Sequence, residues 1–264
     1  MILVECINYD VKQAINIMRG FHSKIDDFHD RLYFNSNEDL DALLSKFDFR
    51  DKDILTVLAS SDQLFYFYDK GARIVDTFDI NKLTFYYYFL RKWIIEYKNR
   101  YYPRNKITGK MLNNIISKVC VKSEEEERAV SFWKRIINSY YTNLIMELFI
   151  VDDDIKKNEN SNIKTIKKKL KSTNLNFYNM DITGYIDLDK KYDVIYKSNI
   201  SDYVSYSNLV RFRDNLYKLL KDDGIIISSN LSYDIYYPNE FGVFSELFNY
   251  KLLDNDMGFV YTKK

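Results

Sequence analysis

Four short apolar runs of this sequence end in acidic or small polar residues whose types suit the binding of a nucleoside. These ends are ASSDQ (59–63), FDIN (78–81), NMDIT (179–183) and KSNIS (197–201). In open α/β sheets, ligands bind in the crevice outside the carboxyl ends of the strands. If the four runs are parallel strands, the side chains that follow them therefore line one ligand site.

The acid after the second run fits a ribose. Asp79 follows Asp62 by 17 residues, close to the ~20 residues expected for a ribose-binding acid in nucleotide-binding folds. A carboxylate suits a vicinal diol because both of its oxygens accept hydrogen bonds. Each acid also has a plainer interpretation, because an Asp at a strand end commonly caps the next helix, as Asp62 or Asp181 could.

The loop after the first run, residues 59–63, contains no glycine. Cofactors that carry a pyrophosphate need glycine there, because the backbone must approach the phosphates closely. The loop therefore disfavours NAD or FAD and favours a ligand without phosphate, such as S-adenosylmethionine. Its small serines leave room for such a ligand, and Asp62 suits an ammonium group, which it can bind by a charge-assisted hydrogen bond.

From residue 51 the chain alternates between short apolar runs and helical patterns. Such alternation is typical of βαβ units with right-handed crossovers, and it predicts a doubly wound, mostly parallel sheet. The last stretch, 248–263, has two apolar runs around Asn255 and Asp256 and predicts a terminal antiparallel hairpin. Strands are predicted over 53–60, 72–80, 175–182, 192–200 and, after a turn at Asp223 and Gly224, 225–231; helices are predicted over 62–71, 81–101 and 207–220.

Two further parts of the chain have helical patterns. In residues 1–50, apolar residues recur at helical spacing, and Ser36 with Asp39 forms a capping-box pattern that opens a second helix. Residues 102–172 interrupt the strand–helix alternation and contain a second capping box, at Ser123. We therefore expect an N-terminal helical segment, 1–50, followed by a ligand-binding domain, 51–264, with a helical insertion at about 102–172.

Composition narrows the class of protein. Apolar residues make up 46% of the chain, enough for a buried core, and the 7 Gly and 2 Pro argue against disorder. The 39 basic and 38 acidic residues leave a net charge of +1, without the basic excess of a nucleic-acid binder. No apolar run approaches the ~20 residues of a membrane span, and no signal peptide is predicted. We expect a soluble cytoplasmic protein.

Two smaller features bear on metals and membranes. Cys6 and Cys120 lie far apart without metal-binding spacing, so no metal site is expected. The lysine run 167–169 is typical of a solvated helix face, and peripheral contact with an anionic membrane is the alternative.

Parts of the sequence resemble a known family. The stretch LYFNSNEDLDALLSKFDFRDKDILTVLASSDQLFYFYDKGARIVDTFDINKLTFYYY (32–88), with YDVIYKSNIS (192–201), looks like a group of bacterial proteins. These are similar to the diacylglycerol aminocarboxypropyl transferase family, which has the Rossmann-like methyltransferase fold. The resemblance covers about 53–100 and 175–230 well and 31–50 moderately.

This resemblance implies S-adenosylmethionine as the cofactor and a role for each strand end. The loop after the first strand would surround the methionine part of the cofactor, and the end of the second strand would bind the ribose. The end of the third strand would face the adenine, and the end of the fourth would form the floor of the reaction site. In that order, the implied residues are Ser60, Ser61, Asp62 and Gln63; Asp79, Ile80 and Asn81; Asp181 and Ile182; and Ser198 and Asn199 as catalytic residues.

Two functions of different classes follow. The first is a transferase that moves an aminocarboxypropyl or methyl group to a small-molecule or lipid acceptor; the loop 59–63 resembles the aminocarboxypropyl family more closely. Such an enzyme works mainly by alignment, so it needs no diagnostic nucleophile. The alternative is a catalytically inactive Rossmann-like protein with a binding or regulatory role, because the loop lacks glycine and no general base is evident.

Overall fold

The computed structural model describes residues 2–20, 30–102, 107–150, 162–229, 237–253 and 258–264. Its contacts divide the chain into two compact units, each assembled from several stretches of sequence. Unit 1 comprises Met1–Asn37, Ala59–Asp62 and Asn81–Thr173, and unit 2 comprises Glu38–Leu58, Gln63–Ile80 and Asn174–Lys264.

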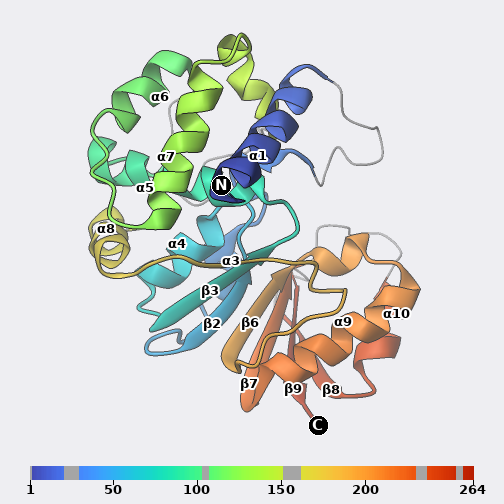
Figure 1. Ribbon diagram of the computed structural model, residues 1–264. Helices are drawn as coiled ribbons and strands as arrows, with labels where there is room; N and C mark the ends of the chain where they lie inside the picture. The colour runs from blue at the N-terminus through green and yellow to red at the C-terminus, as the bar shows by residue number, and fades with distance from the viewer. Residues whose placement is uncertain (1, 21–29, 103–106, 151–161, 230–236, 254–257) are drawn as a thin grey trace. The chain divides into compact units, whose positions relative to one another are not determined.

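Unit 2 is built on a sheet that, in the described residues, has seven strands in the order β5-β3-β2-β6-β7-β9-β8 (Figure 1). The first five are mutually parallel, and β9 runs antiparallel between β7 and β8. The predicted doubly wound, mostly parallel sheet with a C-terminal antiparallel hairpin is thus confirmed. The strands are β2 Asp53–Val57, β3 Ile74–Asp79, β5 Asn176–Asn179, β6 Tyr192–Ser198, β7 Leu220–Ser229, β8 Phe248–Leu252 and β9 Gly258–Lys263.

The strand order reverses between β2 and β6. From β2 the chain adds β3 and β5 on one side, and it later adds β6 and β7 on the other. The carboxyl ends of strands at such a switch point flank the crevice in which doubly wound sheets bind ligands. The residues that follow β2 and β6 are therefore the first candidates for contact with a ligand.

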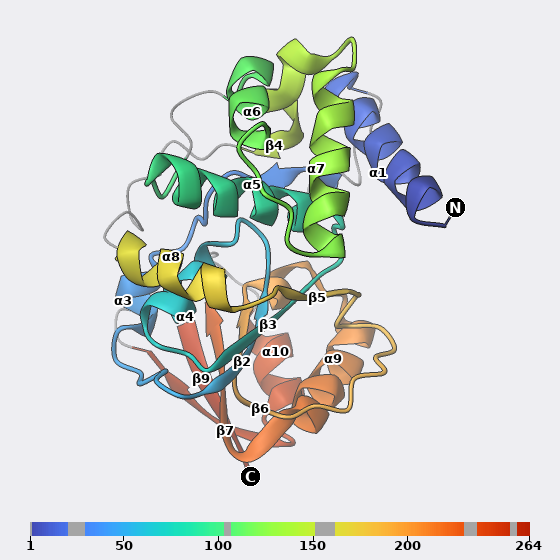
Figure 2. The ribbon, with the colours of Figure 1, turned by 60° about the vertical axis from the view of Figure 1, so that its left-hand side comes forward.

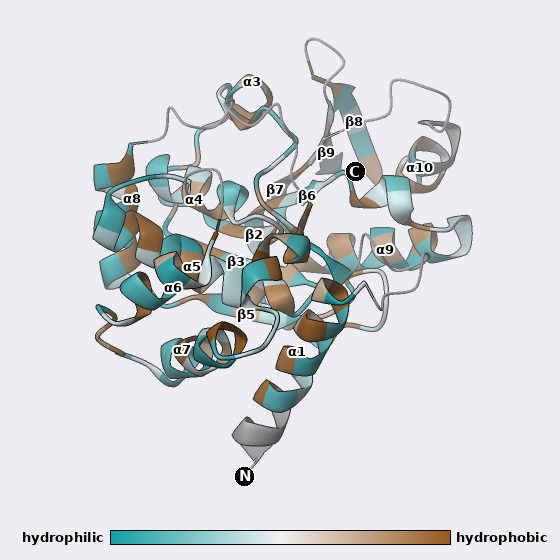
Figure 3. Cartoon of the chain, turned by 90° about the horizontal axis from the view of Figure 1, so that it is seen from above, coloured by the Kyte–Doolittle hydropathy of each residue, from teal (hydrophilic) through white to brown (hydrophobic). Residues whose placement is uncertain are grey.

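Helices cover both faces of this sheet, with α3 and α4 on one side of the strands and α9 and α10 on the other (Figure 3). On the α9 face, the fully buried Leu55, Ile195 and Ile226 share a core with Phe212 and Phe244. The helices are α3 Leu40–Leu44, α4 Asp62–Asp69, α9 Tyr206–Leu219 and α10 Tyr237–Phe244, with a 3-10 turn η3 at Ile200–Tyr203.

Unit 1 is mainly helical and confirms the helices predicted within 102–172. Figure 2 shows α1, α5, α6 and α7 gathered around the short parallel pair β1–β4. Its core is aromatic: the Tyr86 ring stacks on Phe132 with ring centroids 3.9 Å apart, and Trp133 donates to the Tyr86 carbonyl. The elements are α1 Ile2–Met18, β1 Leu32–Tyr33, α5 Leu83–Lys98, α6 Gly109–Ile116, α7 Glu124–Ile137, η1 Thr142–Leu148, β4 Phe149–Ile150 and α8 Ile163–Ser172.

The two predicted capping boxes have different outcomes. Ser123 caps α7, since its hydroxyl accepts from the Glu126 amide at 3.2 Å. The prediction for Ser36 is wrong: α3 begins at Leu40, and Asp39 is its N-cap. The Ser36 amide instead donates to Asp62, a partner 26 residues away that no local pattern indicates.

Two more boundaries differ from the sequence prediction. Strand β7 begins at Leu220, and its pairing with β6 shifts register between Tyr192 and Val194, so Asp223 and Gly224 belong to an irregular part of the strand instead of a separate turn. Helix α10 was not predicted. The predicted hairpin turn at Asn255 and Asp256 lies outside the described residues. Among those described, no helix is both long and apolar enough to cross a membrane.

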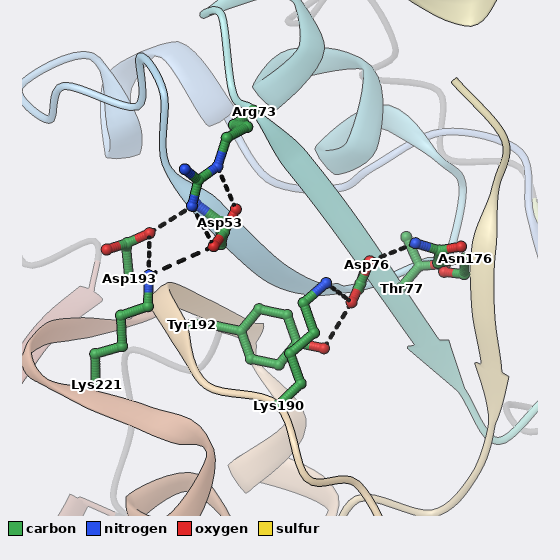
Figure 4. A network of polar contacts seen from close by, with 9 residues as sticks. All are labelled: Asp53, Arg73, Asp76, Thr77, Asn176, Lys190, Tyr192, Asp193 and Lys221. Carbon is green, nitrogen blue, oxygen red and sulfur yellow. Dashed lines mark hydrogen bonds and ion pairs between the residues drawn. The ribbon is translucent and has the colours of Figure 1, made fainter. Parts of the chain in front are cut away.

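The amino ends of the parallel strands carry a polar network (Figure 4). Arg73 binds the Asp53 carboxylate with both Nε and Nη2, at 2.9 and 2.6 Å. Lys221 joins Asp53 to Asp193, which also accepts from the Asp53 amide at 2.8 Å. A second cluster surrounds the buried Asp76. The network ties the strands together at the edge opposite the expected ligand site.

The Asp53 network predicts a pH-dependent stability. Arg73 holds the pKa of Asp53 below its usual value by hydrogen bonding to it. The stabilisation is therefore complete above the unfolded-state pKa of about 3.9 and is lost as pH falls through the lower folded-state pKa. At neutral pH, Asp53→Asn should lower the free energy of unfolding by about 1–2 kcal/mol, because charged hydrogen bonds contribute ~1.5–3 kcal/mol and the exposure of Arg73 reduces this.

Urea unfolding of wild type and variant, from about pH 3 to about pH 7, measures the difference, which should narrow toward acid. Asp223→Asn is the control, because this acid lies in the same sheet, on β7, and is exposed. A difference between Asp53→Asn and wild type that does not change with pH would contradict the assignment.

Candidate functional site

The backbone is strained at the ends of β2 and β6, the strands that flank the switch point. Ala59, Ser61 and Ser198 have φ values of 39°, 74° and 53°. Residues other than glycine rarely adopt positive φ, and such conformations cost of order 1–3 kcal/mol and cluster at binding sites. The loop after β2 thus makes the tight turn that glycine usually supplies, which the sequence alone did not indicate.

In unit 1 this loop is held by a buried ion pair. Asp62 Oδ1 accepts from Arg91 Nη2 at 2.9 Å, and both side chains are 0% exposed. Asp62 Oδ2 accepts from the Ser36 amide at 2.6 Å and from the Ser60 hydroxyl at 2.9 Å. At least three of the roughly four acceptor positions of a carboxylate are therefore taken by the chain itself.

Arg91 extends this contact to the backbone and to three aromatic rings. Its Nη1 donates to the Ser60 carbonyl at 2.9 Å, and its guanidinium lies 4.5–5.8 Å from the ring centroids of Tyr87, Tyr101 and Tyr102. Burial alone would lower the pKa of Arg91, but the charge of Asp62 and the neighbouring tyrosines together raise it above its usual value. Arg91 therefore keeps its charge, and its contacts with Asp62 and the Ser60 carbonyl fix residues 60–62.

Ser61 and Asn81, the other predicted residues of unit 1, differ in their contacts. The buried Ser61 hydroxyl has no hydrogen-bond partner among the residues that the structure describes. Asn81 Oδ1 accepts from the Leu83 amide, and its Nδ2 donates to the Arg31 carbonyl, both at 2.9 Å. Asn81 therefore stabilises the start of α5, and a role toward a cofactor stays a prediction.

In unit 2, the predicted ribose and adenine residues meet where β3 and β5 end. Asp79 pairs with Asn179 in the sheet, and the Met180 amide donates to the Asp79 carbonyl at 3.1 Å. Asn179 also bridges the Asp79 and Ile80 carbonyls. Ile80 is 54% exposed, so an acid and an accessible apolar side chain stand together at this edge.

Asp181 and Ile182 follow β5 directly. Asp181 Oδ1 accepts from both the amide and the hydroxyl of Thr183, at 2.8 and 2.7 Å, a local turn contact of the kind Asp commonly makes. Ile182 is buried in the core beneath α9, and its carbonyl accepts from Asn215. A contact of either residue with adenine stays a prediction.

Ser198 and Gln63 are brought together by an acid that the sequence analysis missed. Glu38, which is buried, accepts from the hydroxyls of Ser198 and Ser229 through Oε1. Through Oε2 it accepts from the Tyr196 hydroxyl at 2.6 Å and from Gln63 Nε2 at 3.3 Å. Ser198 and Ser229 lie 160 and 191 residues further along the chain, so no spacing in the sequence could have linked them to Glu38.

This cluster fixes the direction of its hydroxyl groups. Burial, followed by the charge of Glu38, raises the pKa of Tyr196, so Tyr196 stays protonated and donates. Ser198 and Ser229 also donate to Glu38, and Asn199 Oδ1, 3.2 Å from the Ser198 hydroxyl, is a second acceptor for the Ser198 proton. A serine hydroxyl has a single proton, so any ligand group that binds either serine must be a donor. Beside Ser198, the half-buried Asn199 donates to the Tyr203 hydroxyl at 3.4 Å.

The described residues contain no group of three or more His, Cys, Asp or Glu side chains arranged to hold a metal ion. The arrangement instead offers hydrogen-bonding and apolar contacts. These are suited to holding an organic ligand and orienting a reacting group.

No family model and no curated protein matches this chain. Among solved structures, a TehB-like SAM-dependent methyltransferase from Corynebacterium glutamicum is 10% identical with a TM-score of 0.45, covering 87% of this chain and 90% of that one. The PH0226 protein from Pyrococcus horikoshii is 12% identical with a TM-score of 0.45, covering 92% and 100%. The N-methyltransferase NodS from Bradyrhizobium japonicum is 10% identical with a TM-score of 0.37, covering 84% and 89%. Similarity this low carries no conclusion about what this chain binds.

The buried ion pair predicts non-additive effects on stability. Arg91→Met should cost about 3–5 kcal/mol of unfolding free energy, because it leaves the Asp62 charge buried without its partner. The double variant Arg91→Met/Asp62→Asn should be more stable than the Arg91→Met single variant, since it removes that charge. Urea unfolding of wild type, both single variants and the double variant measures the coupling; additive effects would mean that the pair is not a unit.

Proposed function

We propose that this chain is an S-adenosylmethionine-dependent transferase that moves an aminocarboxypropyl or methyl group to an acceptor. The observation that carries the proposal is Asp79 at the carboxyl end of β3, beside β2, whose following loop turns tightly without glycine. An acid at this place suits a ribose, and a loop of this kind suits a ligand without phosphate.

The residues present fit such a cofactor. Asp79 would accept hydrogen bonds from the ribose hydroxyls, and Ile80 offers exposed apolar surface for the adenine. The loop after β2 would hold the methionine part, where the buried Ser61 hydroxyl has no partner within the described chain. A bound S-adenosylmethionine supplies a carbon activated by the neighbouring sulfonium. The protein's contribution is to align a nucleophile with that carbon and to exclude water.

Ser198 and Ser229 indicate the chemistry of the acceptor. Because these hydroxyls donate their single protons to Glu38, they are left with lone pairs for a ligand, and they would orient an acceptor substrate that carries N–H or O–H. A nucleophilic amine or alcohol fits this requirement, whether on a small molecule or on a lipid. In such a contact the substrate's N–H or O–H donates to the serine oxygen. The lone pair of the substrate's nitrogen or oxygen then stays free to attack the carbon beside the sulfonium.

For the transferred group, we favour aminocarboxypropyl. Its transfer requires the cofactor's methionine tail to turn toward the acceptor, so the loop after β2 must hold the tail in a different pose than for methyl transfer. The support for this choice is the resemblance of residues 59–63 to the aminocarboxypropyl family's loop. The choice between aminocarboxypropyl and methyl affects only the reaction, since the same residues would hold the cofactor in either case.

Cofactor binding is predicted to depend on Asp79. Asp79→Ala should weaken S-adenosylmethionine about ten- to a hundredfold, because hydrogen bonds to a charged group contribute ~1.5–3 kcal/mol. Isothermal titration calorimetry on the full chain measures this. Asp222→Ala, an exposed acid at the start of β7, is the matched control and should bind like wild type. The proposal fails if wild type does not bind, or if Asp79→Ala binds equally well.

The product identifies the group that moves. After incubation with labelled S-adenosylmethionine and mixtures of amines, alcohols and lipids, mass spectrometry should detect 5′-methylthioadenosine as the stoichiometric product. The Asp79→Ala variant and a reaction without protein correct for spontaneous breakdown. Stoichiometric S-adenosylhomocysteine would show that the methyl group moves instead, and the choice of aminocarboxypropyl would be wrong.

A further inference from the structure

Asn35 carries a buried acceptor atom that the described residues leave without a hydrogen bond. Its side chain is 3% exposed. Nδ2 donates to the Ser36 carbonyl at 3.1 Å, which fixes the orientation of the amide, while Oδ1 has no partner in the described chain. Leaving a buried acceptor unsatisfied costs about 1–3 kcal/mol, so such an atom calls for an explanation such as a bound ligand.

The backbone around Asn35 is tied to the loop after β2, within unit 1. The Ser36 amide donates to Asp62 at 2.6 Å. Asn35 precedes one partner of this bond and Ser61 precedes the other, and the Ser61 hydroxyl is also buried without a partner in the described residues. On its other side the segment is held by the Tyr87 hydroxyl, which donates to the Phe34 carbonyl at 2.6 Å. Two unsatisfied polar atoms therefore belong to segments that are bonded together.

The two atoms offer different chemistry. An amide oxygen only accepts hydrogen bonds, whereas a serine hydroxyl can also donate. A ligand that satisfies both must present a donor and an acceptor close together. The ammonium and carboxylate of an α-amino acid meet this requirement, because one carbon carries both. The nearby charged pair contributes little to either group directly, since Asp62 and Arg91 bind each other.

We propose that Asn35 Oδ1 accepts a hydrogen bond from the ammonium of a ligand's α-amino acid end, while the Ser61 hydroxyl donates to its carboxylate. The inference rests on the proposed function, in which this end is the methionine part of S-adenosylmethionine. It gives the N-terminal segment a ligand contact. In this arrangement the Asp62 carboxylate, which binds Arg91, Ser36 and Ser60, holds the two segments together.

Two stable ligands test this contact on the full chain. S-adenosylhomocysteine has the α-amino acid end, and 5′-methylthioadenosine has the same adenosine and thioether without it. By calorimetry, Asn35→Ala should weaken S-adenosylhomocysteine about tenfold or more and leave 5′-methylthioadenosine within about twofold. Asn37→Ala, an exposed position two residues away, should change neither affinity.

A second variant separates ligand contact from folding. Asn35→Asp keeps the side-chain size and an acceptor oxygen for the ammonium but loses the Nδ2 donor to the Ser36 carbonyl. It should therefore bind S-adenosylhomocysteine more tightly than Asn35→Ala does, with 5′-methylthioadenosine unchanged. Equal losses for both ligands in Asn35→Ala, or no loss for either, would overturn the inference while leaving the proposed function intact. If wild type binds neither ligand, the proposed function itself fails.

Discussion

The buried pair of Asp62 and Arg91 is the contact on which the candidate site depends most. Two charges removed from water are stable only when each has its partner and further hydrogen bonds. Asp62 obtains these from Ser36 and Ser60, and Arg91 from the Ser60 carbonyl. The pair therefore fixes the loop after β2 and, with it, the segment that carries Asn35. This restraint is what allows Ala59 and Ser61 to keep strained backbone conformations without glycine.

Glu38 has a comparable role in unit 2, with a different chemical result. Its described contacts are hydroxyl and amide groups from the ends of β6 and β7 and from the start of α4. These groups satisfy the carboxylate and are themselves oriented by it. An acid that orders neighbouring hydroxyls in this way makes them acceptors, which is the property that selects an acceptor substrate with N–H or O–H.

The architecture could be predicted from the sequence because buried parallel strands are short apolar runs, and their alternation with helices is visible locally. Asp79 could also be predicted, since its position depends only on the end of a strand. Glu38 and Asn35 could not, because their partners are defined by tertiary contacts such as Ser36 with Asp62. The same contact explains why the capping box at Ser36 failed. Asp181 and Asn81 show the converse, since both make the local turn and helix-start contacts typical of their residue types.

The proposed function requires that an adenosine binds where β3 and β5 end. A crystal structure of the chain with S-adenosylhomocysteine tests it most directly. We expect the ribose hydroxyls to lie within hydrogen-bonding distance of the Asp79 carboxylate and the adenine to lie against Ile80. An adenosine bound away from the carboxyl ends of the strands, with Asp79 making no contact with the ribose, would contradict it.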